Sequence, residues 1–390
     1  MMFALAACSK HEEPAVARDA AAAAPARDAA VAAVPVDARP PPEKPVPAKL
    51  VVGAHDSCAI LSDKSVRCWG DSGAVKPEMR GVLEVALGDA HGCALLDDGS
   101  VACWGKIGFG GSTRGVVAAA VPGVNDAKRV FALGGASCAS EASGALACWG
   151  DVGASGRVTA TGAHRTPTAV RGLTHVVALT AHAALTDGGD VVMWDGKRAG
   201  TTGVVELATT GAFTCGRTDD GTVECFGADQ PCAAAPAAPA KPTKPAKPTK
   251  PAGKPKHGKP AKPASKPAAP AVRIEKLAGL SPAAQLAFDA GLCALTPGKK
   301  LACLDAAAAC AAERPLALAN IEQTAGSCAR LADGTVHCWS GDAGARTITA
   351  IHGVTGATQL AANGGRACAL LADHSIACWT GTSPATPVTY

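Results

Sequence analysis

The chain of 390 residues carries a formal net charge of +4, and aromatic side chains make up only 3% of it. Its 44 glycines and 28 prolines favour turns and short strands, which argues against a helical bundle. Seventeen cysteines are more than a cytosolic enzyme usually carries, and they indicate an oxidising compartment. No apolar run reaches the roughly 18 residues that span a membrane.

The N-terminus resembles the lipobox of bacterial lipoproteins. Leu5-Ala6-Ala7-Cys8 places small residues before a cysteine, the arrangement at which signal cleavage leaves a lipid-bearing Cys. Only seven residues precede Cys8, without a basic residue and with a short apolar run, so residues 1–8 are a truncated version of such a signal. The resemblance implies lipidation at Cys8, and Ser9 after it implies sorting to the outer membrane.

Residues 9–49 are rich in alanine and proline, with six basic and six acidic side chains. Such a composition cannot bury a hydrophobic core, so we expect a disordered spacer.

A unit of one cysteine, nine residues and Cys-Trp recurs from residue 50 onward. The complete units are Cys58/Cys68-Trp69, Cys93/Cys103-Trp104, Cys138/Cys148-Trp149, Cys328/Cys338-Trp339 and Cys368/Cys378-Trp379. Cys215/Cys225-Phe226 and Cys293/Cys303-Leu304 replace the tryptophan, and an eighth unit, from Ala183 to Met193-Trp194, lacks both cysteines. All six tryptophans occupy this one position, so the chain contains an internal repeat.

Each unit is predicted to fold as a β-hairpin. Alternating apolar residues flank a polar turn such as Asp97-Asp98-Gly99, in which glycine allows the positive φ that a three-residue loop requires. Such a loop places Cys93 and Cys103 opposite each other on one face, where Cβ atoms stand about 4.5–5.5 Å apart. That separation permits a disulfide.

The sequence therefore predicts seven short disulfides, Cys58–Cys68, Cys93–Cys103, Cys138–Cys148, Cys215–Cys225, Cys293–Cys303, Cys328–Cys338 and Cys368–Cys378. In the eighth unit Ala183 and Met193 replace both partners together, which independent thiols would have no reason to do. The nine-residue gap does not suit a zinc knuckle, so we predict no metal. Cys232 and Cys310 remain and are predicted to pair with each other.

The pattern Gly-x-x-His-x-Cys-Ala-Leu, polar turn, Val-x-Cys-Trp-Gly resembles the regulator of chromosome condensation repeat, in the cysteine-paired form of exported bacterial proteins. The resemblance covers residues 50–230 and 274–390, although the usual Gly-Gln-Leu-Gly segment is eroded, for example to Gly73-Ala74-Val75. It implies an all-β fold, a β-propeller of seven or eight blades. Eight hairpin units favour eight, and Trp-to-Trp spacings of 35 and 45 residues suit four-stranded blades.

Residues 231–273 interrupt the repeat with a Lys/Pro/Ala-rich insert that we expect to be disordered. Its nine lysines have no acidic residue among them, and without them the net charge of +4 becomes −5. The lysines are Lys241, Lys244, Lys247, Lys250, Lys254, Lys256, Lys259, Lys262 and Lys266. Their alternation with proline suits polyproline II.

This insert is either a bare low-complexity segment or a contact strip for an anionic polymer, such as surface polysaccharide, teichoic-type chains, lipid headgroups or extracellular DNA. It contains no aromatic residue, so bases cannot stack on it. Any nucleic-acid binding would therefore be non-specific.

Three motifs suggest chemistry but fit the repeat better. Gly70-Asp71-Ser72-Gly73 resembles the nucleophile segment of trypsin-like proteases, yet no partner histidine and aspartate can be identified. His55, His91 and His182 occupy nearly the same repeat position, which favours structural histidines bonded to a neighbouring turn. The glycine-rich residues 108–112 do not open a helix after a strand, so no phosphate cradle is expected. We predict no catalytic residue and no cofactor.

These observations predict a monomeric, exported, lipid-anchored propeller at the outer membrane, in the periplasm or on the surface of a bacterium. It would bind an envelope protein or an anionic polymer without catalysis, and would reach the membrane only through its lipid. The alternatives are an inhibitor of an exported enzyme, since a bacterial propeller of this type inhibits β-lactamases, and an enzyme on the same scaffold. The exchange-factor activity of the nuclear member of the family does not carry over, because the loops differ.

Overall fold

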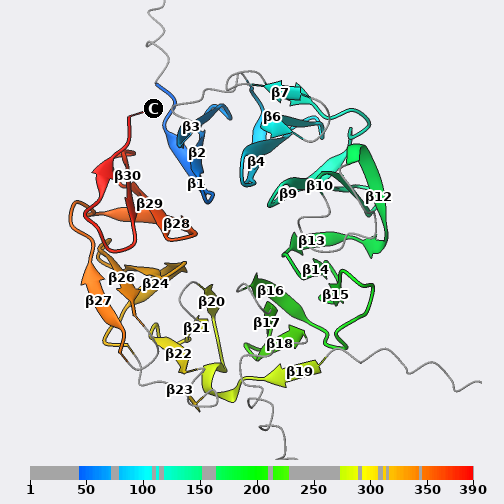
Figure 1. The fold of residues 1–390 in the computed structure, drawn as a ribbon. Coiled ribbons are helices and arrows are strands. Elements are labelled where there is room, and N and C mark those ends of the chain that lie inside the picture. Colours follow the sequence, from blue (N-terminus) through cyan, green and yellow to red (C-terminus); the bar gives the residue numbers. More distant parts are fainter. Residues whose placement is uncertain are drawn as a thin grey trace, which may run out of the picture. The chain divides into compact units, whose positions relative to one another are not determined.

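The computed structural model describes residues 44–71, 79–107, 111–113, 118–151, 164–209, 214–227, 273–288, 292–305, 311–312, 316–341 and 345–389. The chain divides into two units, Met1–Lys44 and Pro45–Tyr390, and every named strand lies in the second. In this second unit eight small antiparallel sheets follow one another around a ring (Figure 1). The all-β propeller is confirmed, with eight blades.

The blades are numbered 1 to 8 in chain order. Blade 1 is β1 (Pro47–Val52), β2 (Asp56–Leu61) and β3 (Val66–Gly70); blade 2 is β4 (Val82–Leu87), β5 (His91–Leu96), β6 (Val101–Ile107), β7 (Gly111–Thr113) and β8 (Ala119–Ala120). Blade 3 is β9 (Ala127–Leu133), β10 (Ala136–Glu141), β11 (Ala145–Gly150) and β12 (His164–Thr174); blade 4 is β13 (Val176–Leu179), β14 (Ala183–Thr186) and β15 (Val191–Met193).

The second half of the ring follows the same plan. Blade 5 is β16 (Val204–Thr209), β17 (Thr214–Thr218), β18 (Val223–Gly227) and β19 (Arg273–Lys276); blade 6 is β20 (Gln285–Phe288), β21 (Leu292–Leu295), β22 (Leu301–Asp305) and β23 (Ala311–Ala312). Blade 7 is β24 (Ile321–Ala325), β25 (Cys328–Leu331), β26 (Val336–Ser340) and β27 (Thr347–Ala350); blade 8 is β28 (Ala357–Asn363), β29 (Arg366–Leu371), β30 (Ile376–Thr380) and β31 (Thr386–Pro387). The one described helix is a 3-10 turn, η1 (Ala278–Leu280).

The hairpin at the middle of each blade has the predicted loop. In blade 2 the Leu96 amide donates to the Ser100 carbonyl over 2.9 Å, which leaves the three residues 97–99 in the turn. Gly99 has φ +81°, the left-handed conformation that glycine adopts without steric cost. Lys64, Lys299 and His374 adopt the same conformation in their units, so the repeat imposes this backbone even where glycine is missing.

The seven predicted hairpin disulfides are all present, each between directly paired residues such as Cys93 and Cys103. In the eighth unit Ala183 pairs with Met193 in the same register. Cys232 and Cys310 lie outside the described residues, so their predicted pairing stays a prediction.

The core consists of apolar clusters between neighbouring blades, and it explains why tryptophan follows the second cysteine. Trp149 of blade 3 is buried against the Cys93–Cys103 disulfide of blade 2, and Trp104 packs in the same way on blade 1. A large aromatic face and a polarizable disulfide fill this space well. Phe226, which replaces tryptophan in blade 5, packs against blade 4, the one blade whose hairpin has no disulfide.

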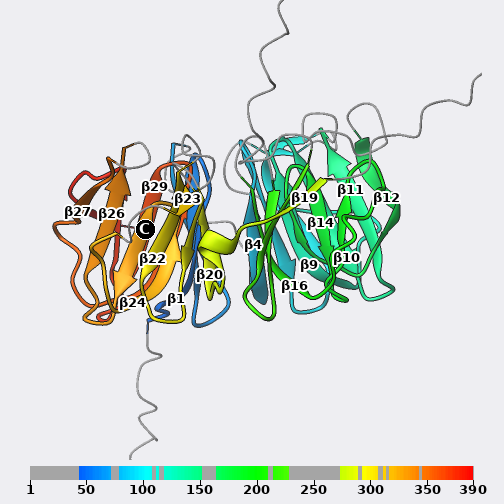
Figure 2. The same cartoon turned by 90° about the horizontal axis from the view of Figure 1, so that it is seen from below.

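The ring closes without a strand shared between the two ends of the chain. Blade 1 contains only N-terminal strands and blade 8 only C-terminal ones. Trp69 packs in a cluster with blade 8, the Leu50 amide donates to Gln359 Oε1 over 3.0 Å, and Arg366 pairs with Asp71. Packing and side-chain bonds therefore hold the closure. In side view the sheets stand next to one another around the axis (Figure 2).

Two predicted boundaries differ slightly from the strands. β1 begins at Pro47, within the predicted spacer 9–49, because Val46 already pairs with Ser62 through its carbonyl. Arg273, the last residue of the predicted insert 231–273, is the first residue of β19 and pairs with Gly227. No helix among the described residues is long and apolar enough to cross a membrane.

Candidate interaction surface

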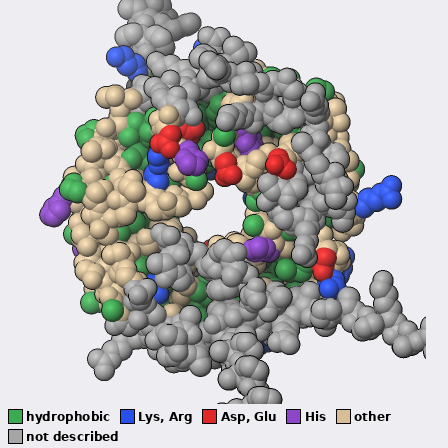
Figure 3. Space-filling model, viewed as in Figure 1, with side chains coloured by type: hydrophobic (Ala, Val, Ile, Leu, Met, Phe, Trp, Pro, Cys, Tyr) green, Lys and Arg blue, Asp and Glu red, His purple; other side chains and the backbone are tan. Residues whose placement is uncertain are grey.

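Short turns between the first and second strands of the blades leave one end of the central channel open. We call this end the mouth face and define it by the turns Gly53–His55, Gly88–Ala90, Gly134–Gly135 and Gly364–Gly365. Acidic, histidine and basic side chains gather around the channel opening (Figure 3). Polar groups around a concave opening are a suitable surface for binding.

A three-residue cluster joins blades 1 and 8 on the mouth face. Asp71, directly after β3, accepts from His55 Nδ1 at 3.0 Å through one carboxylate oxygen and from Arg366 Nη2 at 2.9 Å through the other. These hydrogen bonds, first from His55 and then from Arg366, hold the pKa of Asp71 below its ordinary value. Asp71 and His55 remain more than half exposed, so a partner could reach both.

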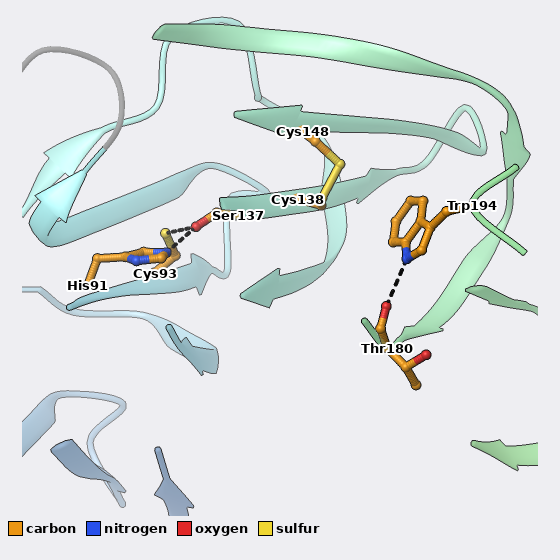
Figure 4. Close-up of a disulfide and its surroundings, with 7 residues drawn as sticks. All are labelled: His91, Cys93, Ser137, Cys138, Cys148, Thr180 and Trp194. Atoms are coloured by element: carbon orange, nitrogen blue, oxygen red, sulfur yellow. Dashed lines mark hydrogen bonds between the residues drawn. A yellow bond between two sulfur atoms is a disulfide. The ribbon is translucent and has the colours of Figure 1, made fainter. Parts of the chain in front are cut away.

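A second polar group joins blades 2 and 3 and is buried. His91 Nε2 lies 2.6 Å from Ser137 Oγ, and this hydroxyl lies 3.3 Å from Cys93 Sγ (Figure 4). Burial lowers the pKa of His91, while the Asp89 carboxylate and the Ala136 backbone act in the opposite direction. His91 is therefore a neutral, structural residue at neutral pH.

The three histidines of the repeat do not share one role. His91 is buried and bonded to the next blade, as expected, whereas His55 is exposed and pairs with Asp71. His182 is half-buried and lies directly before Ala183, the position of the missing cysteine. His91 stands two residues before the first paired position of its unit, His55 three and His182 one. Because successive side chains of a strand point to opposite faces, the three histidines lie on different faces or in the turn before the strand.

The predicted lysine insert departs from the mouth face. It connects β18 to β19, and its flanking residues Gly227 and Arg273 are directly paired. Thr214, which follows the mouth-side turn of blade 5, pairs with Phe226 next to Gly227. Both ends of the insert are therefore fixed at one point of this face. The nine lysines themselves, like Cys8, lie outside the described residues.

The described residues contain no group of three or more His, Cys, Asp or Glu side chains that could hold a metal ion. The protease-like segment at residues 70–73 brings Asp71 to His55, but Arg366 engages the same carboxylate and Ser72 lies outside the described residues. The sequence did not reveal the contact of Asp71 with Arg366, because the two residues lie 295 positions apart. No local pattern could have shown it.

Comparison with known proteins gives one repeat match. Residues 82–110, which include β4, β5 and β6, match the Regulator of chromosome condensation (RCC1) repeat. No curated protein matches the chain.

Several solved structures match the chain at low similarity. Prp20p from Saccharomyces cerevisiae is 13% identical, with 79% of this chain and 77% of that chain covered and a TM-score of 0.41. BamB from Moraxella catarrhalis is 12% identical, with 86% and 96% covered and a TM-score of 0.44. The CRINKLY WD40 ectodomain of the Arabidopsis thaliana receptor kinase ACR4 is 16% identical, with 89% and 100% covered and a TM-score of 0.41.

No function is transferred from these neighbours. The repeat match lies in a blade with a hairpin disulfide, and the same disulfide recurs in six other blades. The chain is an eight-bladed, disulfide-paired β-propeller whose second blade matches the RCC1 repeat over residues 82–110.

Proposed function

We propose that the protein is an exported, non-catalytic binding module of the bacterial cell envelope. The seven disulfides fit an oxidising compartment outside the cytosol. The lipobox-like segment ending in Cys8 supports a lipid anchor at the outer membrane. A palmitate label that is present in the wild type and lost in Cys8→Ser would test the anchor.

The binding activity that we propose is for an anionic polymer, through the nine lysines of the insert. The observation that carries the proposal is the pairing of Gly227 with Arg273, which fixes both ends of the lysine segment at the mouth face. A segment tethered at both ends brings nine positive charges to a chain whose net charge is −5 without them. Contacts of this kind release counterions and weaken steeply with salt.

Deletion of residues 240–270 tests this proposal. The shortened loop still bridges two directly paired residues, so the fold and its thermal stability should be unchanged. Wild-type protein should be retained on a heparin-type column at low salt and released as salt rises, whereas the deletion variant should pass through.

A charge-neutralised control separates the effect of loop length from the effect of charge. Replacement of the nine lysines by glutamine keeps the length and the prolines, and it should lose retention as fully as the deletion does. If either variant binds as well as the wild type, the insert is a spacer and the proposed polymer binding is wrong.

A further inference from the structure

The first strands of the blades line the central channel, and a set of side chains there ties each blade to the next. We call the residues that directly precede the central core residue of each first strand the belt residues. They are Lys49, Glu84, Arg129, Ala178, Glu206, Gln285, Gln323 and Gln359, in blades 1 to 8.

Five belt residues accept a hydrogen bond from the first strand of the following blade. Gln323 Oε1 accepts from the Leu360 amide over 2.9 Å, and its Nε2 donates to the Leu360 carbonyl over 2.8 Å. Gln285 makes the same two bonds to Thr324. Gln359, Glu206 and Glu84 accept from the corresponding amides of blades 1, 6 and 3. Each bond occupies a backbone group on the channel edge of a strand, where no neighbouring strand can reach it.

Arg129 makes a variant of this contact, because its guanidinium donates to the Val177 carbonyl of blade 4 over 3.1 Å. The belt is interrupted at two junctions. At Ala178 the methyl side chain has no group that can bond to Leu207 of blade 5, and Lys49 makes no such bond to blade 2 among the described residues.

The junction between blades 4 and 5 is the weaker of these two. Its apolar cluster contains six buried residues, against seven at the ring closure and nine to eleven at the other junctions. The junction between blades 1 and 2 keeps a cluster of ten, with Trp104 on a disulfide, and a Lys64–Asp97 ion pair of 3.5 Å. Apolar burial is the main source of cohesion between blades.

Blade 4 also has little support on its outer side. Like blade 1 it has three named strands, where the other blades have four or five, and in the described part of the chain the segment after β15 returns only through an isolated bridge between Val192 and Arg198. Its hairpin lacks the disulfide that the other seven units have. Val205, one of two exposed large hydrophobic residues in the described part of the chain, lies at this same junction.

We infer that the ring opens between blades 4 and 5, where β13 and β16 are neighbours along the channel (Figure 1). The missing belt bond, the small apolar cluster and the reduced blade 4 are three separate features of one junction. Opening there separates β13 from β16 and widens the channel on one side, while the belt keeps the arc from blade 5 through blade 8 to blade 1 together. The propeller thus has a built-in hinge at a defined place.

Amide hydrogen exchange on the intact, oxidised chain tests this inference. A backbone bond crosses the junction from the Val204 amide to the Gly189 carbonyl. Its counterpart between blades 2 and 3 runs from the Ala127 amide to the Gly99 carbonyl. We expect Val204 to exchange faster than Ala127 under native conditions. Equal exchange at the two junctions would overturn the hinge.

The variant Ala178→Gln restores the missing belt residue. Glutamine at this position can bond to Leu207 as Gln323 bonds to Leu360, and it should slow exchange at Val204 by roughly 2- to 10-fold, the effect of one added hydrogen bond. Lys49→Gln is the matched control, since it adds the same side chain at the other interrupted junction and should leave exchange at Val204 unchanged. If Ala178→Gln folds with its seven disulfides intact and exchange at the Val204 amide does not slow, the assignment of the hinge is wrong.

Discussion

An eighth disulfide can be introduced at the one hairpin that lacks it. Ala183 and Met193 are directly paired in the register that joins the cysteines of the other seven hairpins, whose Cα atoms stand 3.9–4.1 Å apart. The double variant Ala183→Cys/Met193→Cys should therefore form the bridge without movement of the backbone. The closed loop has the same ten-residue separation as the natural ones.

The gain in stability follows from two opposing terms. Closing a loop of this length removes conformational entropy from the unfolded chain worth about 2.7 kcal/mol. Shortening the half-buried Met193 removes apolar contact worth about 1 kcal/mol. The net expectation is an increase of about 1–2 kcal/mol in the free energy of unfolding, or a melting temperature a few degrees higher.

Phe226 determines how much of this gain is realised. It is fully buried against the hairpin of blade 4, where six other blades place a tryptophan against a disulfide, as Trp194 lies against Cys138–Cys148 (Figure 4). Addition of Phe226→Trp to the double cysteine variant should fill the space left by Met193. In the wild-type background the same tryptophan should destabilise by about 1–3 kcal/mol, because the larger ring meets the methionine.

The assay compares oxidised Ala183→Cys/Met193→Cys with Ala183→Ser/Met193→Ser by scanning calorimetry, after non-reducing peptide mapping has shown which sulfurs are joined. The serine variant has nearly the same volume and no bridge, so the difference isolates the cross-link. A bridge that forms and leaves the melting temperature at that of the serine variant would refute the reasoning. Failure of the two cysteines to pair would refute the register.

Further expectations concern single positions. Thr324→Val should stabilise the propeller by about 1–2 kcal/mol in denaturant unfolding, because Thr324 Oγ1 is buried without a partner where Leu50 and Leu360 stand in their blades; Thr324→Ser should not. The depressed pKa of Asp71 contributes stability above the unfolded pKa that is lost as the pH falls through the folded one, so the ring closure should weaken below about pH 4, and Asp71→Asn should abolish this part of the pH dependence in melting curves. Among the nine lysines of the insert, trypsin should cut only after Lys256, because proline follows the other eight. Mass mapping should find a nicked protein that elutes as one particle until the fold is disrupted, since β19 remains paired with β18.

The elements that the sequence predicted well are the local ones. Each hairpin, with its turn and its disulfide, is contained in about a dozen residues, so cysteine spacing and the alternation around Asp97–Gly99 were enough to predict it. The contacts between blades were not predictable in the same way. Trp149 was recognised as a repeat position, but its partner is the disulfide of the preceding blade, and no pattern within one unit indicates which blade an aromatic ring will face.

The sequence contains a pattern at the belt positions that was not recognised as a contact between blades. Glu84, Glu206 and Gln285 each stand between two apolar residues, as in Val-Leu-Glu-Val, and Gln359 directly precedes the apolar Leu360 in Ala-Thr-Gln-Leu. Strand propensity does not explain a glutamine in the first strand, because the hydrogen-bond partner of that glutamine is a backbone amide of the next blade. Glu84, Glu206 and Gln359 each stand nine residues before the first cysteine of their units, so alignment by the cysteines brings these three into one column, whereas Gln285 stands eight residues before its cysteine and Gln323 five.

The position of the insert in blade 5 follows from the way the ring is held together. A 45-residue segment, from 228 to 272, separates β18 from β19, yet these strands pair as closely as any in the described part of the chain. The apolar cluster between blades 5 and 6 includes Val223 and Cys225 from before the insert and Leu277 and Leu280 from after it. The entropy of closing a long loop grows only slowly with its length, so this local pairing can offset it. An insertion between the third and fourth strands of a blade therefore attaches both ends of a charged segment at the mouth face while the belt, the disulfides and the closure between blades 8 and 1 keep their contacts.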